Sequence, residues 1–280
     1  MSGESVEHYK NHGSWTNPGQ FDLLIKPLPD DVEALAHVVQ NLFIHSDYIS
    51  LYGLEDEDFL SSSRGTLSIE SRLKNIVATN KSPLEVNRCP QERTFTTCRD
   101  YALMLCSFLR EKDYSARVRC GFATYFEDNK YEDHWVCEYW NAKSKCWCIA
   151  DAQLDGEHCA YLLIDFNTVD IPLDKFLLSG YAWKQYRSAS VEASIFGHGD
   201  STGPMFLVIN LVRDYLALRN QEASIWDTWR DLLPFEERLD STILTCCDNL
   251  ADVILNVDIE FKNLILAQEN IDAMYELIWK

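Results

Sequence analysis

The sequence predicts an α+β fold, in which a central helix is followed by an antiparallel sheet and a helical C-terminal region. Three observations support this class. Apolar residues recur at helical spacing after Cys98, three strand-like segments lie between residues 116 and 150, and helical spacing returns beyond residue 205. We find no internal repeat and no low-complexity tract.

Composition sets limits on the possible functions. Of the 280 residues, 46% are hydrophobic, which is enough for a packed core and argues against disorder of the whole chain. The formal net charge is −19, so nucleic acids and anionic membranes are disfavoured as partners, whereas cationic amines would be attracted. No run of 18 apolar residues occurs, and residues 1–20 contain no apolar signal segment. We therefore expect a cytoplasmic location with reduced cysteines.

The first third of the chain contains two predicted helices. Residues 1–20 are polar and predict a flexible leader. Apolar residues at helical spacing predict helices over Val32–Phe43, after Pro29 and two aspartates, and over Ser68–Ala78. Two prolines interrupt Lys81–Arg93, which predicts a loop.

The central third carries the most informative pattern. Thr96 or Thr97 can cap a helix that begins at Cys98 and ends near Lys112. Strand-like segments follow, bounded by the turns 127–130 and 141–145; they are Ala116–Phe126, Asp133–Trp140 and Cys146–Ala150. The order predicts a helix packed on an antiparallel sheet, with Asp151 at the end of its last strand.

The last third is predicted to be helical. Residues 191–204 are small and glycine-rich, which predicts a boundary loop between a catalytic domain of residues 21–190 and a helical extension of residues 205–280. Helical spacing within this extension covers Met205–Leu218, Phe235–Leu255 and Phe261–Ile278. This extension is large enough to cover a cleft, to self-associate or to bind a partner.

Three separated residues suggest thiol chemistry. Cys98 lies at a predicted helix start, where unpaired N–H groups and the helix dipole favour a thiolate. His134 lies on a strand beside Trp135, and a histidine in that place can accept the thiol proton. Asp151, at the end of the adjacent strand, can fix the tautomer of that histidine. We therefore predict a catalytic triad of Cys98, His134 and Asp151.

The chain also resembles the transglutaminase-like superfamily of papain-type cysteine enzymes. The resemblance spans roughly residues 65–155, and its motifs are Thr97-Cys98-Arg99-Asp100-Tyr101-Ala102, Ala116-Arg117-Val118-Arg119-Cys120-Gly121-Phe122, Asp133-His134-Trp135 and Trp147-Cys148-Ile149-Ala150-Asp151. It implies a papain-like core that attacks an amide or peptide carbonyl through a thioester, followed by hydrolysis or transfer to an amine. It gives Cys98 the role of nucleophile, His134 that of general base and acid, and Asp151 that of orienting residue. It implies a protein, peptide or small amide substrate.

The chain departs from the family pattern in two respects. No tryptophan lies between Trp15 and Trp135, so the tryptophan that stabilises the oxyanion in animal transglutaminases has no counterpart. The Cys98 N–H is the first oxyanion donor, and Asn87, Tyr48 or Tyr52 are candidates for the second. The paired CxxC zinc ligands of the deglycosylating amidases are also absent, and we expect neither a metal nor a cofactor.

Other interpretations remain open for several residues. The chain as a whole can be a catalytically silent interaction module that keeps the fold. Asp100 is expected to complement the helix dipole, and Arg117 and Arg119 to form structural ion pairs. A metal site is conceivable where four residues lie near one another in sequence, namely Cys146, Cys148, His158 and Cys159.

Overall fold

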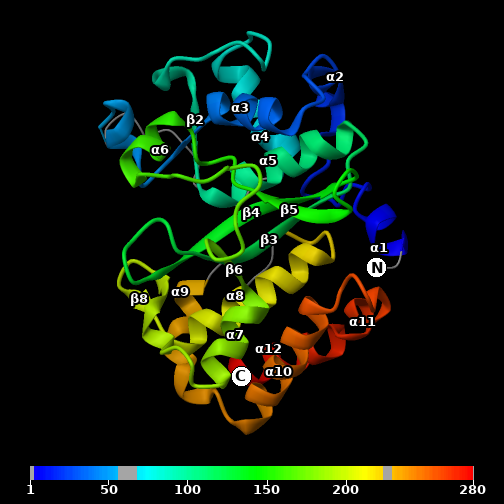
Figure 1. Cartoon of the computed structure of the whole chain (residues 1–280), viewed down its shortest axis with the longest axis vertical. Coiled ribbons are helices and arrows are strands. Elements are labelled where there is room, and N and C mark those ends of the chain that lie inside the picture. Colours follow the sequence, from blue (N-terminus) through cyan, green and yellow to red (C-terminus); the bar gives the residue numbers. More distant parts are fainter. Residues whose placement is uncertain (1–2, 56–67, 223–228, 280) are drawn as a thin grey trace. The chain divides into compact units, whose positions relative to one another are not determined.

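The computed structural model describes residues 3–55, 68–222 and 229–279. The chain forms two compact units that are interleaved along the sequence. Unit 1 consists of Met1–His8, Arg119–His134 and Leu173–Lys280, and unit 2 consists of Tyr9–Val118 and Trp135–Pro172. Helices and strands of both units make the chain an α+β protein, as predicted (Figure 1).

Unit 2 is built around the long helix α5, Cys98–Glu111, which is buried from Arg99 to Arg110. The helices α3 and α4 pack against it (Figure 1). The remaining helical segments of this unit are short. The helical elements of unit 2 are η1 Gly19–Phe21, α2 Asp22–Ile25, α3 Val32–Leu42, η2 Ile49–Tyr52, α4 Ile69–Thr79, η4 Pro90–Glu92, α5 and α6 Gly156–Leu162.

Side-chain caps fix where the helices around α5 begin. The Asp31 carboxylate accepts the Ala34 N–H at 3.0 Å at the start of α3. The Ser68 hydroxyl accepts the Ser71 N–H at 3.3 Å at the start of α4. Each cap satisfies a backbone donor that has no partner within the helix. These caps explain why both predicted helices begin within a residue of the expected place.

The strands of unit 2 form two pairings. β1, Phe43–His45, is parallel to β2, Thr94–Thr96. β4, Tyr131–Asn141, is antiparallel to β5, Cys146–Ala150, with Cys137 opposite Ala150. Burial raises the pKa of Cys137, and the Cys106 thiol of α5 beside it adds to that increase. The helix therefore lies against this antiparallel pair, as the sequence predicts.

Unit 1 contains a sheet to which β3, Ala116–Ala123, and β4 contribute. The part of β3 after residue 118 and the part of β4 before residue 135 belong to this unit. The strand order is β6-β3-β4-β7-β8. β6 is antiparallel to β3, β7 is parallel to β4, and β8 is antiparallel to β7. The new strands are β6 Phe176–Leu178, β7 Phe196–His198 and β8 Ser201–Thr202. The strands β3 and β4 thus run through both units.

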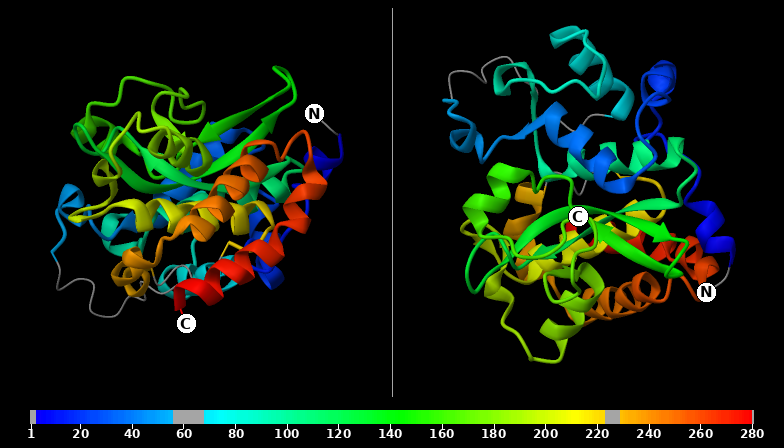
Figure 2. Two further views of the ribbon diagram at one scale, coloured as in Figure 1. Left: turned by 90° about the horizontal axis from the view of Figure 1, so that it is seen from below. Right: turned by 45° about the horizontal axis from the view of Figure 1, so that its top comes forward.

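The helices of unit 1 pack around α8, which is buried along its whole length. α7 and α10 pack against α8 and against each other, and α12 packs against α10. Figure 2 shows α10 (orange) and α12 (red) side by side. The helical elements of unit 1 are α1 Gly3–His8, α7 Ser179–Arg187, η5 Ala193–Ile195, α8 Pro204–Leu218, α9 Trp229–Leu232, η7 Leu233–Arg238, α10 Ser241–Leu255, α11 Phe261–Leu266 and α12 Gln268–Trp279.

Several segments differ in detail from the expectation. The predicted leader contains α1 and a buried Tyr9, whose carbonyl accepts Arg110 Nε at 3.1 Å. Phe261–Ile278 forms two helices, α11 and α12, instead of one. The loop of residues 191–204 contains η5, β7 and β8. The predicted division into residues 21–190 and 205–280 remains a prediction.

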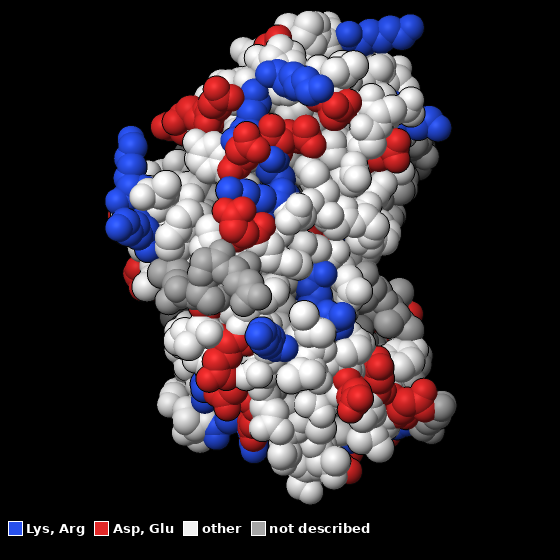
Figure 3. All heavy atoms as spheres, turned by 90° about the vertical axis from the view of Figure 1, so that its right-hand side faces the viewer, with Lys and Arg blue, Asp and Glu red and all other residues white. Residues whose placement is uncertain are grey.

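Charges of both signs are interspersed on the face drawn in Figure 3. The net charge of −19 is therefore not gathered there into one acidic patch. Among the described residues, no helix combines the length and the apolar character that a membrane span requires.

Candidate functional site

Cys98 occupies the first position of α5, and its side chain is only half-buried although the helix behind it is buried. The residue before it, Thr97, is extended (φ −119°, ψ 171°), and its side chain makes no capping hydrogen bond. A thiol at this position faces the positive end of the helix dipole. The position fits the predicted nucleophile.

The first turn of α5 is held by a buried carboxylate. Asp100 accepts hydrogen bonds from Arg72 Nε at 3.0 Å and from Arg72 Nη2 at 2.7 Å. The Thr96 hydroxyl also donates to this carboxylate. Asp100 lies in the first turn as predicted, but its contacts are an ion pair and a hydrogen bond that the sequence did not predict, and they tie α4 and β2 to the turn that carries Cys98.

His134 lies on β4 in unit 1, with 2% of its surface exposed. Its ring is surrounded by aromatic side chains. The centroid distances are 4.8 Å to Phe126, 6.1 Å to Tyr125 and 6.4 Å to Phe176, all with steep interplanar angles. Such an aromatic environment limits the rotation of the imidazole and excludes water from it.

The predicted orienting residue, Asp151, follows β5 directly in unit 2 and is 1% exposed. Its Oδ1 accepts the Gln153 N–H at 2.9 Å, and its own N–H donates to the Thr168 carbonyl at 2.8 Å. A carboxylate this deeply buried requires hydrogen bonds or charge partners to remain ionised. Two hydrogen bonds, one from the Asp151 N–H and one to its carboxylate, thus fix the turn that carries Asp151.

Asp151 also acts electrostatically on α5. Burial raises the pKa of Tyr101 well above its ordinary value, and the charges of Asp155 and Asp151 contribute to that increase. Tyr101 comes three residues after Cys98, so the two share one face of the helix. Cys98 and Asp151 both belong to unit 2, whereas His134 belongs to unit 1. The meeting of all three around one sulfur remains a prediction.

The other cysteines differ from Cys98 in their surroundings. Burial raises the pKa of Cys137, Cys159 and Cys247 above the usual thiol value, and it raises that of Cys148 to about 12. These thiols stay protonated and unreactive at neutral pH. Cys89 and Cys146 are exposed. Cys98 combines partial exposure with the first position of a long helix. Cys159 is also half-buried, but burial raises the pKa of its thiol, and neither Cys89 nor Cys146 begins an α-helix.

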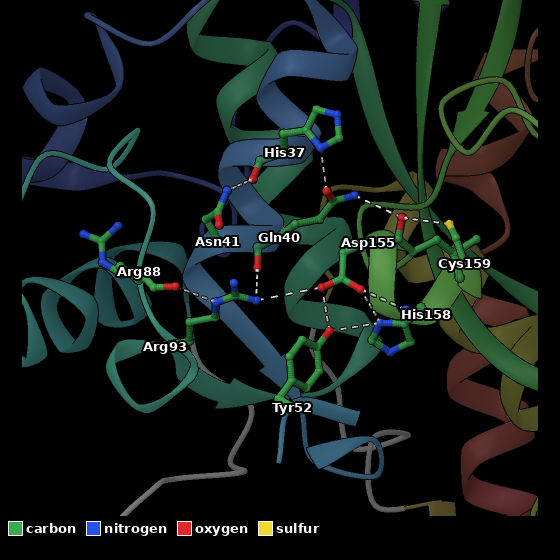
Figure 4. Close-up of polar contacts among 10 residues, drawn as sticks. His37, Gln40, Asn41, Tyr52, Arg88, Arg93, Asp155, His158 and Cys159 are labelled. Carbon is green, nitrogen blue, oxygen red and sulfur yellow. Dashed lines mark hydrogen bonds and ion pairs between the residues drawn. The ribbon is translucent and has the colours of Figure 1, made fainter. Parts of the chain in front are cut away.

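A polar cluster that the sequence reasoning missed lies at the start of α6 (Figure 4). Asp155 caps α6 and accepts the His158 N–H at 3.0 Å, His158 Nδ1 at 2.9 Å and the Tyr52 hydroxyl at 2.6 Å. Arg93 lies over the Tyr52 ring at 5.5 Å. The local signal was the spacing of Asp155 and His158, an acidic cap three residues before a histidine. Tyr52 and Arg93 come from distant segments.

The state of each group in this cluster follows from its contacts. Burial alone would raise the pKa of Asp155, but the hydrogen bonds from His158 and Tyr52 lower it below its usual value. Burial and the charge of Asp155 raise the pKa of Tyr52, so its hydroxyl stays protonated and donates a hydrogen bond to the carboxylate. His158 Nδ1 must then carry hydrogen to bond Asp155. Tyr52 is therefore engaged elsewhere and is not free to act as the second oxyanion donor.

The predicted ion pairs and the conceivable metal site can be compared with the structure. Arg117 pairs with Glu138 at 2.5 Å and Arg119 pairs with Asp214 at 2.8 Å, which confirms their structural role. Within the described ranges, no three histidine, cysteine or acidic side chains are grouped as a metal site would require. The conceivable site at Cys146, Cys148, His158 and Cys159 is not assembled there, because His158 faces Asp155 and Tyr52 instead.

Comparisons with known proteins add one distant structural match. Neither the family models nor the curated proteins that were searched match this chain. Among solved structures, the chain is similar to a candidate cysteine protease from Cytophaga hutchinsonii, with a TM-score of 0.40 and 13% sequence identity. The match covers 64% of this chain and 46% of that protein, so this chain spans less than half of its length.

Proposed function

We propose that the chain is a cysteine-dependent acyl hydrolase or acyltransferase of the transglutaminase-like type. Cys98 is the nucleophile, His134 is the general base and acid, and Asp151 orients the imidazole. The substrate is an amide or peptide carbonyl. The observation that carries this proposal is the placement of a half-exposed thiol at the first position of the otherwise buried α5.

The helix supports the chemistry at the sulfur and at the substrate oxygen. The first N–H groups of a helix have no partner four residues earlier, and they point toward the end where Cys98 lies. The Asp100 N–H donates to the Thr97 carbonyl at 3.0 Å, so the N–H groups before it are the donors at issue. They favour negative charge on the sulfur, and the Cys98 N–H can donate to the oxyanion that forms on attack. The buried Arg72–Asp100 pair keeps this turn rigid, so the donors are preorganised.

The reaction follows from these roles. The Cys98 thiol gives its proton to His134, and the sulfur attacks the carbonyl carbon. The C–N bond breaks as the imidazolium returns that proton to the leaving amine, which leaves a thioester on Cys98. Water or a second amine then attacks the thioester and gives its proton to the imidazole, which returns it to the departing sulfur. The identity of this acceptor decides between hydrolysis and transfer.

The test is mass spectrometry of glutamine-containing peptides incubated with the full chain and a small primary amine. A mass change of +1 marks hydrolysis of a carboxamide, and addition of the amine marks transfer. We expect Cys98→Ala and His134→Ala to abolish both products, whereas Cys89→Ala retains them. Product formation that survives Cys98→Ala would contradict the assignment. A fully inactive native chain would favour the silent interaction module.

A further inference from the structure

Unit 2 contains a pocket of about 440 Å³ that includes neither Cys98 nor Asp151 among its lining residues. It is lined by α3, η2, η4 and the start of α6, through Gln40, Asn41, Leu51, Tyr52, Pro90, Arg93, Asp155, Gly156 and Glu157. Pockets of roughly 300–1,000 Å³ with a few converging polar groups are typical of small-molecule sites. The chemistry of the wall indicates which molecule fits.

Arg93 gives the pocket a cation with an open edge (Figure 4). Its Nε donates to the Arg88 carbonyl at 3.2 Å, and its Nη1 donates to the Gln40 carbonyl at 3.4 Å. These bonds and the Tyr52 ring beneath the guanidinium hold it in one orientation. Within the described part of the chain, Nη2 has no hydrogen-bond partner. A planar guanidinium fixed in this way is suited to an incoming carboxylate.

The nearest acid does not neutralise this cation fully. Asp155 Oδ2 lies 3.8 Å from Arg93 Nη1, which is longer than a hydrogen bond. The same carboxylate already accepts three hydrogen bonds from Tyr52 and His158. Both side chains are 14% exposed, so their charges are partly desolvated. The positive charge of Arg93 is therefore available to a ligand in the pocket.

Acceptors line another part of the wall. Glu157 is exposed, and no described residue pairs with its carboxylate. The Asn41 amide nitrogen donates to the His37 carbonyl, which leaves its oxygen as an acceptor. One cation beside two carboxylates also disfavours a doubly charged anion such as phosphate. A ligand with a single negative charge and an adjacent ammonium group complements both parts.

We infer that this pocket is a binding site for a free amino acid, with its α-carboxylate on Arg93 and its α-ammonium on Glu157 and the Asn41 oxygen. The site is independent of the thiol chemistry proposed above. Binding is therefore expected in the Cys98→Ala chain as well, and its failure would leave the catalytic proposal unaffected.

The experiment screens the twenty amino acids one at a time against the full chain by thermal unfolding, followed by calorimetric titration. A ligand at ten times its Kd should raise Tm by about 2–4 °C. The α-amide of the best binder, which lacks the carboxylate, should bind at least about tenfold more weakly. Its N-acetyl derivative, which lacks the ammonium, should bind more weakly as well.

Two variants assign the contacts. Arg93→Gln should weaken binding by at least about tenfold, because it removes a charged hydrogen-bond donor. Since Arg93 also holds two backbone carbonyls, Glu157→Gln is the second variant; this exposed change leaves the fold intact. Glu157→Gln should weaken binding of the free amino acid and leave the binding of its N-acetyl derivative unchanged. The inference is overturned if no amino acid shifts Tm, or if both variants bind as the native chain does.

Discussion

Arg72 and Asp100 form a two-point ion pair, with Nε and Nη2 at 3.0 Å and 2.7 Å from the two carboxylate oxygens. Both side chains are nearly inaccessible, at 1% and 3% exposure. The pair joins α4 to the first turn of α5. Arg99 Nη1 also lies 3.7 Å from Asp100, so the carboxylate has a second, weaker cation beside it. Removing Arg72 alone leaves the buried carboxylate with only this weaker partner.

The first prediction concerns this pair. Arg72→Met should lower the free energy of unfolding by about 3–5 kcal/mol, because the buried Asp100 loses its two-point partner and keeps only Arg99 Nη1, at 3.7 Å, as a cation. Arg72→Met/Asp100→Leu should recover much of that loss. Urea unfolding measures both. Lys184→Met, at the exposed Lys184–Asp252 pair, is the control and should change stability by less than about 1 kcal/mol. Equal losses in the single and double variants would contradict the prediction.

The second prediction concerns the reactivity of the thiols. Iodoacetamide at pH 6 should alkylate Cys98 about tenfold faster than the exposed Cys89 and Cys146, because only Cys98 lies at the start of a long helix. Peptide mapping by mass spectrometry measures each rate. His134→Ala should remove most of the difference if the imidazole accepts the thiol proton. Equal labelling of all three cysteines in the native chain would count against an activated thiol.

The third prediction is a pH dependence at Asp155. Its pKa is lowered in the folded chain, so the stability it contributes is present above its unfolded value, 3.8, and is lost as the pH falls through the folded value. Asp155→Asn should therefore flatten the loss of stability below about pH 4. Tyr52→Phe should cost about 1–2 kcal/mol at pH 7 because it removes one donor. Thermal unfolding from pH 7 to pH 2 tests both, and an acid profile that Asp155→Asn leaves unchanged would refute the assignment.

The fourth prediction concerns Asp214, a fully buried carboxylate of unit 1. It accepts hydrogen bonds from Arg119, from the Cys120 N–H at 3.0 Å and from the Ser179 hydroxyl at 3.0 Å. Ser179→Ala should cost about 1 kcal/mol, whereas Arg119→Met should cost about 3–5 kcal/mol. Urea unfolding gives both values, with the exposed Ser188→Ala as the control. A smaller loss for Arg119→Met than for Ser179→Ala would show that the charge is compensated elsewhere.

Elements with long periodic patterns were predicted well. The stripe after Cys98 is long enough to identify α5, and the aromatic and β-branched residues around Trp135 identify β4. The short elements were missed for a physical reason. β1, β6 and β7 have three residues each, and β8 has two, so none of them shows a period. α6 and α7 were missed as well, and their short amphipathic stretches resemble loops.

The candidate site residues also fall into those that the sequence could place and those that it could not. Cys98 and Asp151 could be placed from the sequence because each lies at the end of a recognisable element. The cluster of Tyr52, Arg93 and Asp155 could not, because its members are 41 and 62 positions apart and nothing local links them. Only tertiary structure brings them to one pocket. A hydrogen-bonded cap such as Asp155 predicts where α6 starts but not what approaches it.

The interleaved course of the chain has a consequence for its synthesis on the ribosome. Every residue of unit 2 has been translated once Pro172 is added, whereas unit 1 still lacks Leu173–Lys280. Its Arg119–His134 segment must therefore wait, tethered at both ends, for partners that emerge later. Unit 2 is thus able to fold first, and the Arg119–His134 segment completes its own unit only when Leu173–Lys280 has been made.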